Sequence, residues 1–165
     1  PHPAGSVQNT PDGKGKKILL DAAKGLRYLH LQSPPVVHYD IKPHNILISA
    51  CGVGKLADVG GAKRLERVGT LRQVGTQGYA PPETANTNAA SDIYSFGVMI
   101  WVVYTACDPD HVPQRAEIIT NMNDEHNPSP IFTLLMGDGA HRGALANAAN
   151  KHSRPSALKL VAALS

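Results

Sequence analysis

The stretch VVHYDIKPHNILI, residues 36–48, places a dense group of polar residues between two apolar segments. The β-branched residues at both ends predict short strands, so the polar group should lie on the loop between them. Loops that a rigid scaffold supports are where binding and catalytic residues concentrate. Asp40, Lys42 and Asn45 lie within six residues of each other and are therefore candidates for a functional site.

A predicted β-hairpin follows this loop. Ile46–Ser49 and Leu56–Ala57 have the composition of short strands, and the Gly-rich stretch ACGVGK between them is typical of a turn. A hairpin of this kind would bring Asp58, which follows the second strand, back beside Asn45.

The joint spacing of these polar residues favours phosphoryl transfer. Asp40 offers a carboxylate that can accept a proton, and Lys42 offers an ammonium that can balance a phosphate. Asn45 and Asp58 offer the oxygen ligands that Mg²⁺ prefers, and Mg²⁺ usually takes only one or two ligands from protein. In phosphoryl transfer the protein mainly positions groups and neutralises charge. Taken singly, each residue has an ordinary explanation as a turn former or a solvated side chain.

The rest of the chain predicts a mainly helical fold. Apolar residues recur at helical spacing from Lys16 to Leu31, where SPP ends the pattern. Residues 89–106 are apolar on nearly every side, which indicates a buried helix. Asp92 near its start is favoured by the helix dipole and should act as an N-terminal cap. Ile131–Met136 and Pro155–Leu164 are further helical candidates, and residues 60–79 predict a long functional loop.

Composition limits the possible classes of protein. The 165 residues fit one domain, with residues 1–15 as a disordered lead-in and 16–165 as the folded part. A net charge of +3 without a basic stripe gives no support for nucleic-acid binding. The two cysteines argue against a disulfide framework and favour an intracellular, cytoplasmic location. The most apolar run is too short to span a bilayer directly.

Five motifs together resemble a eukaryotic-type protein kinase, specifically its large C-terminal catalytic lobe. They occur in the order and with nearly the gaps of that family, and they cover roughly residues 16–165. The motifs are HYDIKPHN for the catalytic loop, ADVG for the D-F-G segment, GTQGYAPPE for the end of the activation segment, SDIYSFGVMIW for the central helix and RPS for the terminal Arg motif.

The resemblance implies a mainly α fold, a C-lobe helical bundle with a small β-hairpin sheet that carries the catalytic loop, and no N-lobe. It implies that ATP and Mg²⁺ are the cofactors. In that scheme Asp40 is the catalytic base, and Lys42 steadies the γ-phosphate. Asn45 and Asp58 hold the metal, and Leu47 lies under the adenine ring.

The resemblance also assigns supporting residues. Asp92 would bond the backbone of the catalytic loop, and Glu83 would pair with Arg154. Lys42 two positions after Asp40, together with Thr76, is similar to Ser/Thr rather than Tyr kinases. The stretch SDIYSF at the start of the central helix is similar to the tyrosine-kinase-like group of Ser/Thr kinases.

Several positions depart from the family pattern. Tyr39 stands where many kinases carry the Arg that clamps a phosphorylated activation loop, so phosphorylation at Thr70 or Thr76 should not act through that ion pair. Val59 replaces the Phe of D-F-G, which shrinks an apolar plug expected against His38. Pro81 replaces the Ala of A-P-E. Nothing before residue 16 resembles a Gly-rich loop, the strand Lys or its Glu partner.

Two interpretations follow. In the first, the parent protein is an ATP-dependent Ser/Thr protein kinase that acts on a protein substrate, and the isolated lobe has little or no activity. In the second, the chain is a pseudokinase-like or kinase-fragment scaffold that binds partners without catalysis. Both expect an apolar face near Leu47 and Val59 that the missing N-lobe in cis, or a docking protein, would cover. A small-molecule phosphotransferase is a remote third interpretation.

Overall fold

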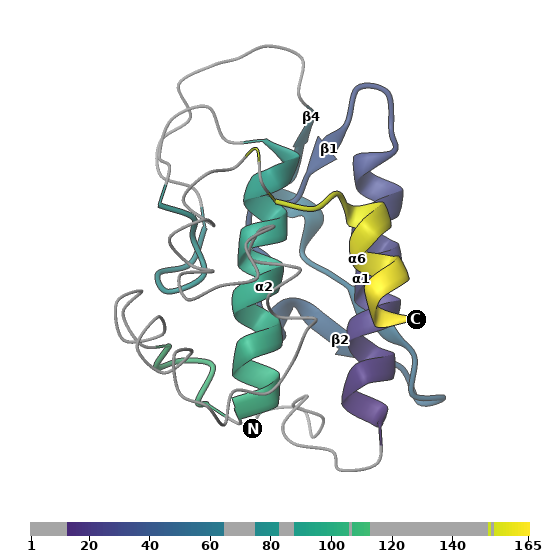
Figure 1. Ribbon diagram of the computed structural model, residues 1–165, viewed down its shortest axis with the longest axis vertical. Coiled ribbons are helices and arrows are strands. Elements are labelled where there is room, and N and C mark those ends of the chain that lie inside the picture. The colour runs from purple at the N-terminus through teal and green to yellow at the C-terminus, as the bar shows by residue number, and fades with distance from the viewer. Residues whose placement is uncertain (1–12, 65–74, 83–87, 106, 113–151, 153) are drawn as a thin grey trace.

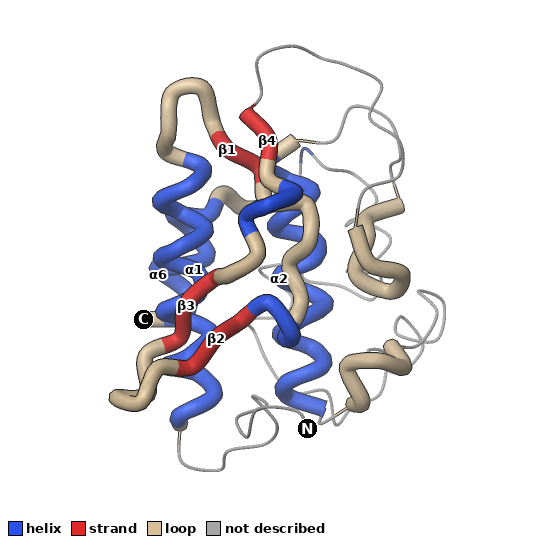
Figure 2. Tube along the Cα trace, turned by 180° about the vertical axis from the view of Figure 1, so that it is seen from behind, coloured by secondary structure: helices blue, strands red, loops and turns tan. Residues whose placement is uncertain are grey.

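The computed structural model describes residues 13–64, 75–82, 88–105, 107–112, 152 and 154–165. Over these residues it has three α-helices, two small antiparallel sheets and two short 3₁₀-helices, Pro43–Asn45 and Val59–Gly61. Helix α1 (Lys14–His30) lies beside α6 (Ala157–Leu164), and α2 (Ala89–Thr105) runs alongside them (Figure 1). Both sheets lie on the same side of α1 and α2 (Figure 2). The predicted mainly helical fold with a small hairpin is confirmed over these residues.

Helix α1 forms because its apolar residues recur on one face. Of the four residues whose spacing predicts this face, Ile18, Ala22 and Leu26 are buried and Leu29 is half-buried. The buried face packs against α6 and the hairpin. The helix begins at Lys14, two residues before the start expected from the sequence, and it ends at His30. Its C-terminal end therefore lies just before the loop that leads into the polar stretch.

Helix α2 is the buried centre of the fold. All its residues from 91 to 102 are buried, which confirms the prediction of a helix that is covered all round. Asn88 makes the cap bond, because its Oδ1 accepts from the Ala90 amide at 2.9 Å, and Ser91 Oγ accepts from the Asn88 amide at 3.2 Å. Asp92 lies in the first turn, as predicted, but its carboxylate points to another segment, described below.

The predicted hairpin is present and carries the polar loop. Strand β2 (Ile46–Ile48) pairs antiparallel with β3 (Gly54–Leu56), with Ile46 opposite Leu56. A second pair joins β1 (Val36–Val37) to β4 (Lys63–Arg64). The sequence expected only a long loop over residues 60–79, and this expectation is wrong at β4. A strand of two residues has too few side chains to show a periodic pattern.

The C-terminal helix forms about where the sequence placed it. Helix α6 begins at Ala157, and the Ser156 hydroxyl accepts from the Lys159 amide at 3.4 Å. The predicted helix at 131–136 and the predicted Glu83 ion pair lie outside the described residues. Among the residues that are described, no helix combines the length and the apolar character that crossing a membrane needs.

Gly54 lets the hairpin approach α1 closely, and replacing it should destabilise the fold. A Cβ at this position would lie 2.7 Å from the Ile18 carbonyl oxygen, which is backbone and cannot rotate away. Gly54→Ala should therefore lower the free energy of unfolding by about 1–3 kcal/mol, measured by urea denaturation. Gly61→Ala is the matched control, because a Cβ there meets nothing within 4 Å. Equal losses in the two variants would contradict this account of the packing.

Candidate active site

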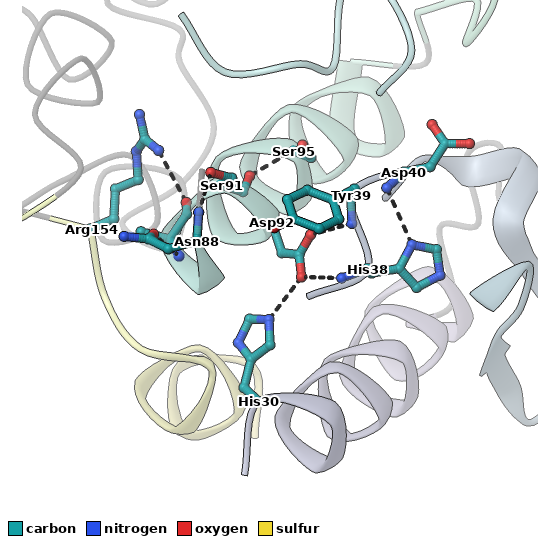
Figure 3. Close-up of polar contacts among 10 residues, drawn as sticks. His30, His38, Tyr39, Asp40, Asn88, Ser91, Asp92, Ser95 and Arg154 are labelled. Atoms are coloured by element: carbon teal, nitrogen blue, oxygen red, sulfur yellow. Dashed lines mark hydrogen bonds and ion pairs between the residues drawn. The ribbon is translucent and has the colours of Figure 1, made fainter. Parts of the chain in front are cut away.

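The buried Asp92 carboxylate holds the start of the polar loop. Its Oδ2 accepts from the His38 amide at 2.8 Å, and its Oδ1 accepts from the Tyr39 amide at 2.8 Å (Figure 3). Asp92 is only 1% exposed, so these bonds are shielded from water. The loop is thus fixed by the central helix, which is the contact that the family resemblance implied.

The His38 side chain ties the loop to the end of the hairpin. Its Nδ1 accepts from the Asp40 amide at 3.3 Å, so its Nε2 is the nitrogen that donates to the Ala57 carbonyl at 2.9 Å. The Ala57 amide in turn donates to the Asn45 carbonyl at 2.8 Å. Asp58 is the next residue, so the hairpin returns its backbone to the neighbourhood of the polar loop.

Asp40, Lys42 and Asn45 converge, and Thr76 joins them. Thr76 Oγ1 donates to Asp40 Oδ1 at 2.7 Å, and Lys42 Nζ donates to Thr76 Oγ1 at 2.7 Å. Lys42 Nζ also lies 3.0 Å from Asp40 Oδ2. Asn45 Nδ2 donates to the same Oδ2 at 3.0 Å and to the Asp40 carbonyl at 2.7 Å. The carboxylate is therefore oriented by three different side chains.

The same contacts keep Asp40 ionised. Partial burial alone would raise its pKa, but the hydrogen bonds from Thr76, Lys42 and Asn45 and the charge of Lys42 outweigh burial and hold the pKa below its usual value. An ionised carboxylate has about four acceptor positions on its two oxygens, so it can take a further proton donor. The cluster thus presents a carboxylate that can accept a hydroxyl proton at neutral pH.

Thr76→Val should raise the pKa of Asp40, because the variant removes the shortest of the three side-chain contacts to the carboxylate, which lowers that pKa, without changing the side-chain shape. A carboxyl group whose pKa is lowered in the folded state stabilises the fold above its unfolded pKa and loses that contribution as the pH falls through the folded pKa. In the variant this stabilisation should be smaller, and its loss should be complete at a higher pH. A ¹³C NMR titration of the Asp40 carboxyl measures the shift, and Thr76→Ser, which keeps the hydroxyl, is the control. An unchanged pKa in Thr76→Val would refute the assignment.

Asp58 and Leu47, two further predicted site residues, have exposed side chains. The Asp58 side chain is exposed, and among the described residues no hydrogen bond joins its carboxylate to Asp40, Lys42 or Asn45. Leu47 on β2 is 56% exposed. Val59, expected as a plug against His38, is 55% exposed instead.

Asn45 and Asp58 carry side-chain oxygens of the kind that Mg²⁺ prefers as ligands. Asn45 uses its Nδ2 for Asp40, which leaves the opposite amide atom, Oδ1, as the possible ligand. The Asp58 carboxylate is accessible from solvent. Two oxygen ligands of this kind are the usual protein share of a magnesium site that also binds phosphates.

The sequence motifs and this geometry agree with a comparison against known families. The profile of the protein kinase domain matches residues 6–162. The chain belongs to the protein kinase family. The match begins ten residues before the expected start of the folded part at residue 16.

Curated kinases are similar to this kinase domain over much of its length. Receptor-like protein kinase HSL1 of Arabidopsis thaliana is 47% identical over 102 residues, which cover 56% of this chain and 10% of that protein. The L-type lectin-domain containing receptor kinase S.1 of the same plant is 39% identical over 116 residues, covering 66% of this chain and 18% of the relative.

A third relative is similar over a longer stretch. Receptor-interacting serine/threonine-protein kinase 2 of Bos taurus is 29% identical over 163 residues, which cover 87% of this chain and 30% of that protein. The chain thus spans less than a third of the length of these curated relatives. The relatives include Ser/Thr kinases, and protein kinases in general use ATP and Mg²⁺ and act on protein substrates.

Tyr39 occupies the family's Arg position in an unusual backbone conformation. Its φ is 69°, which non-glycine residues rarely adopt, and its side chain is buried at 6% exposure. The buried hydroxyl has no hydrogen-bond partner within the described part of the chain. An aromatic ring packed at this position differs chemically from a guanidinium that could bind a phosphate.

The sequence does not reveal two important contacts. It marks Thr76 only as a feature of Ser/Thr kinases and a phosphorylation position, whereas the Thr76 hydroxyl belongs to the Asp40 cluster. It gives no sign of the contact between His30 Nε2 and Asp92 Oδ2, which is 2.8 Å long. The two contacts join residues that are 36 and 62 positions apart in the sequence, so no local spacing could reveal them.

Proposed function

We propose that this chain is the C-terminal catalytic lobe of a Ser/Thr protein kinase, which transfers the γ-phosphate of ATP to a protein hydroxyl. The observation that carries the proposal is the Asp40 carboxylate, held ionised and oriented by Thr76, Lys42 and Asn45. Membership of the protein kinase family supports it, as does the similarity to Ser/Thr kinases.

Each residue of the cluster has a role in this reaction. Asp40 accepts the proton of the substrate hydroxyl, and Lys42 neutralises charge on the γ-phosphate while it remains bonded to Thr76. Asn45 and Asp58 would hold Mg²⁺. When bound, this ion would supply positive charge that offsets the charge developing on the phosphates. Thr76 links the catalytic loop to the segment at 75–82, where the protein substrate would lie.

The exposed apolar side chains support an N-lobe supplied in cis. Leu47 and Val59 are 56% and 55% exposed, as the sequence predicted for this face. Leu47 would contact the adenine ring from below, and an N-lobe would cover the remaining apolar surface and hold the triphosphate. Without such a lobe the chain alone should transfer phosphate very slowly, because a base accelerates a reaction only when the substrates are positioned.

A scaffold role is the second candidate, and the same exposed face favours it. A surface hollow of about 290 Å³ lies between α1 and the hairpin, and its lining includes Tyr28, Leu56 and Val59 but no residue of the Asp40 cluster. A docking protein that used this face would need no catalysis. In either case we place the chain in the cytoplasm, where ATP is abundant and free thiols such as Cys51 and Cys107 persist.

Regulation should not depend on the usual phosphate clamp. Tyr39 lacks the charge that would pair with a phosphate at Thr70, and Thr76 already uses its hydroxyl in the Asp40 cluster. If Thr70 carries the phosphate, treatment of the active protein with a phosphatase should therefore leave its rate of phosphate transfer unchanged.

The test is phosphate transfer from γ-labelled ATP by a polypeptide that contains this chain together with its N-terminal kinase segment. We expect transfer that requires Mg²⁺, and phosphoamino-acid analysis should detect phosphoserine or phosphothreonine. Transfer only to tyrosine would contradict the Ser/Thr assignment. No transfer to protein under any of these conditions, with the polypeptide folded, would favour the scaffold.

A further inference from the structure

The hollow between α1 and the hairpin is a surface feature that the Asp40 cluster does not use. Helix α1 packs against strand β3 (Figure 2), and the hollow of about 290 Å³ lies along this junction. Tyr28 and Leu29 of α1 and Leu56 of β3 form its apolar walls. Leu47, the predicted adenine contact, does not line it. The hollow therefore shares no residue with the cluster or with that contact.

Two glycines in the lining leave the hollow without side chains of its own to fill it. Gly54 cannot carry one, because a Cβ there would lie 2.7 Å from the Ile18 carbonyl oxygen. A Cβ at Gly25 would lie 3.4 Å from the Cβ of Leu56, which is ordinary contact. The volume is at the lower end of the range for ligand sites, about 300–1,000 Å³. It therefore suits one large side chain of another molecule.

The exposed wall of the hollow favours an aromatic side chain. Tyr28 is 68% exposed, although its ring lies beside the apolar lining. Aromatic rings attract one another in offset or edge-to-face contacts, in addition to the gain from removing apolar area from water. An aromatic anchor would therefore gain more from this wall than an aliphatic one.

The rim of the hollow is positively charged. Lys17 and Lys24 lie 2.9 Å and 3.8 Å from the Asp21 carboxylate and are 54% and 55% exposed. Asp21 is only 15% exposed and also accepts from the Gly54 amide at 3.3 Å. Lys55 is exposed on β3 and forms no salt bridge within the described part of the chain. Three lysines around one covered carboxylate select acidic residues on a partner by charge complementarity.

We propose that this hollow docks a second protein through a segment that presents one aromatic side chain between acidic residues. The aromatic side chain fills the hollow against Tyr28 and Leu56, and its acidic neighbours pair with Lys55 and the lysines of α1. The inference rests on the scaffold candidate of the proposed function, for which it names the chemistry of the partner. The binding needs neither ATP nor Asp40, so docking and phosphate transfer can fail separately.

NMR titration of the full ¹⁵N-labelled chain tests the proposal with the capped synthetic peptide Glu-Asp-Trp-Asp-Glu. The amides of Gly25, Gly54 and Leu56 should shift along one saturable binding curve, from which the Kd is read. The peptide Lys-Lys-Trp-Lys-Lys keeps the anchor and reverses the charge, and Glu-Asp-Ala-Asp-Glu removes the anchor. Each should bind at least about fivefold more weakly. No shift with about 1 mM of the first peptide, or equal Kd values for all three, would overturn the proposal.

Variants of the chain locate the binding. Tyr28→Ala removes the aromatic wall and Lys55→Glu reverses a rim charge, so each should weaken binding of the acidic tryptophan peptide about fivefold or more. Leu158→Ala and Lys159→Glu are the matched controls, because both residues are exposed on α6 and neither lines the hollow. The controls should bind as wild type does. Wild-type affinity in both Tyr28→Ala and Lys55→Glu would contradict the assigned site.

The longer polypeptide with its N-terminal kinase segment distinguishes a second protein from an N-lobe in cis. Val59 lines the hollow and is also one of the exposed residues that an N-lobe would cover. A Kd within about threefold of the value for this chain supports docking of a second protein. A larger loss of affinity means that the N-lobe occupies the hollow, and the proposal is then wrong. Peptide binding without any phosphate transfer would contradict the proposed catalysis and leave the docking site intact.

Discussion

Asp92→Ala should lower the free energy of unfolding by about 3–5 kcal/mol, the usual cost of removing one partner from a buried charged contact. The Asp92 carboxylate accepts from the backbone amides of His38 and Tyr39 and from His30. Alanine would leave these donors buried without an acceptor, and each such group costs about 1–3 kcal/mol. Urea unfolding followed by circular dichroism measures the loss.

A surface carboxylate provides the control for this prediction. Asp110→Ala removes a side chain that is 64% exposed and whose contact with His44 is 3.3 Å long. Surface changes of this kind usually alter stability by less than about 0.5 kcal/mol. If Asp92→Ala were no more destabilising than Asp110→Ala, the central helix would not be what holds the polar loop.

The helices and the hairpin could be predicted because their signals are local. Ile18, Ala22 and Leu26 mark one face of α1 by spacing alone, and the unbroken apolar run of α2 indicates burial all round. Strand β4 could not be predicted, because it depends on pairing with β1, more than twenty residues earlier in the sequence. Pairing over such distances depends on the packed fold. A strand of two residues is too short to show a hydrophobic pattern in the sequence.

The candidate site likewise contains residues that local spacing could predict and one that it could not. Asp40, Lys42 and Asn45 share one loop, so their short spacing was enough to predict that they converge. Thr76 completes the cluster only because the segment at 75–82 folds back against that loop.

The direction of the Asp92 side chain also needed the structure. A carboxylate in the first turn of a helix is ordinarily a cap, but in this chain Asn88 makes the cap bond. Asp92 is thereby left to hold the loop. The family motifs implied this contact, whereas composition and spacing did not.

Asp40→Asn should abolish most phosphate transfer while leaving the fold intact. The variant has nearly the same shape, but an amide cannot accept the hydroxyl proton as a carboxylate does, and a general base contributes about 10²–10⁴-fold to a rate. The side chain is 27% exposed, so the change leaves no buried charge without a partner. A loss of activity in a variant that still unfolds in one cooperative thermal transition would assign the effect to chemistry.

The most direct test of the account is the rate of γ-phosphate transfer by matched variants of the longer polypeptide that contains this chain. Asp21→Asn is the control, because that carboxylate lies on α1 and pairs with Lys17, outside the cluster. The account predicts that Asp21→Asn transfers phosphate at nearly the wild-type rate and that Asp40→Asn is slower by about 10²–10⁴-fold. A rate for Asp40→Asn equal to that of wild type would contradict the claim that this cluster performs phosphoryl transfer.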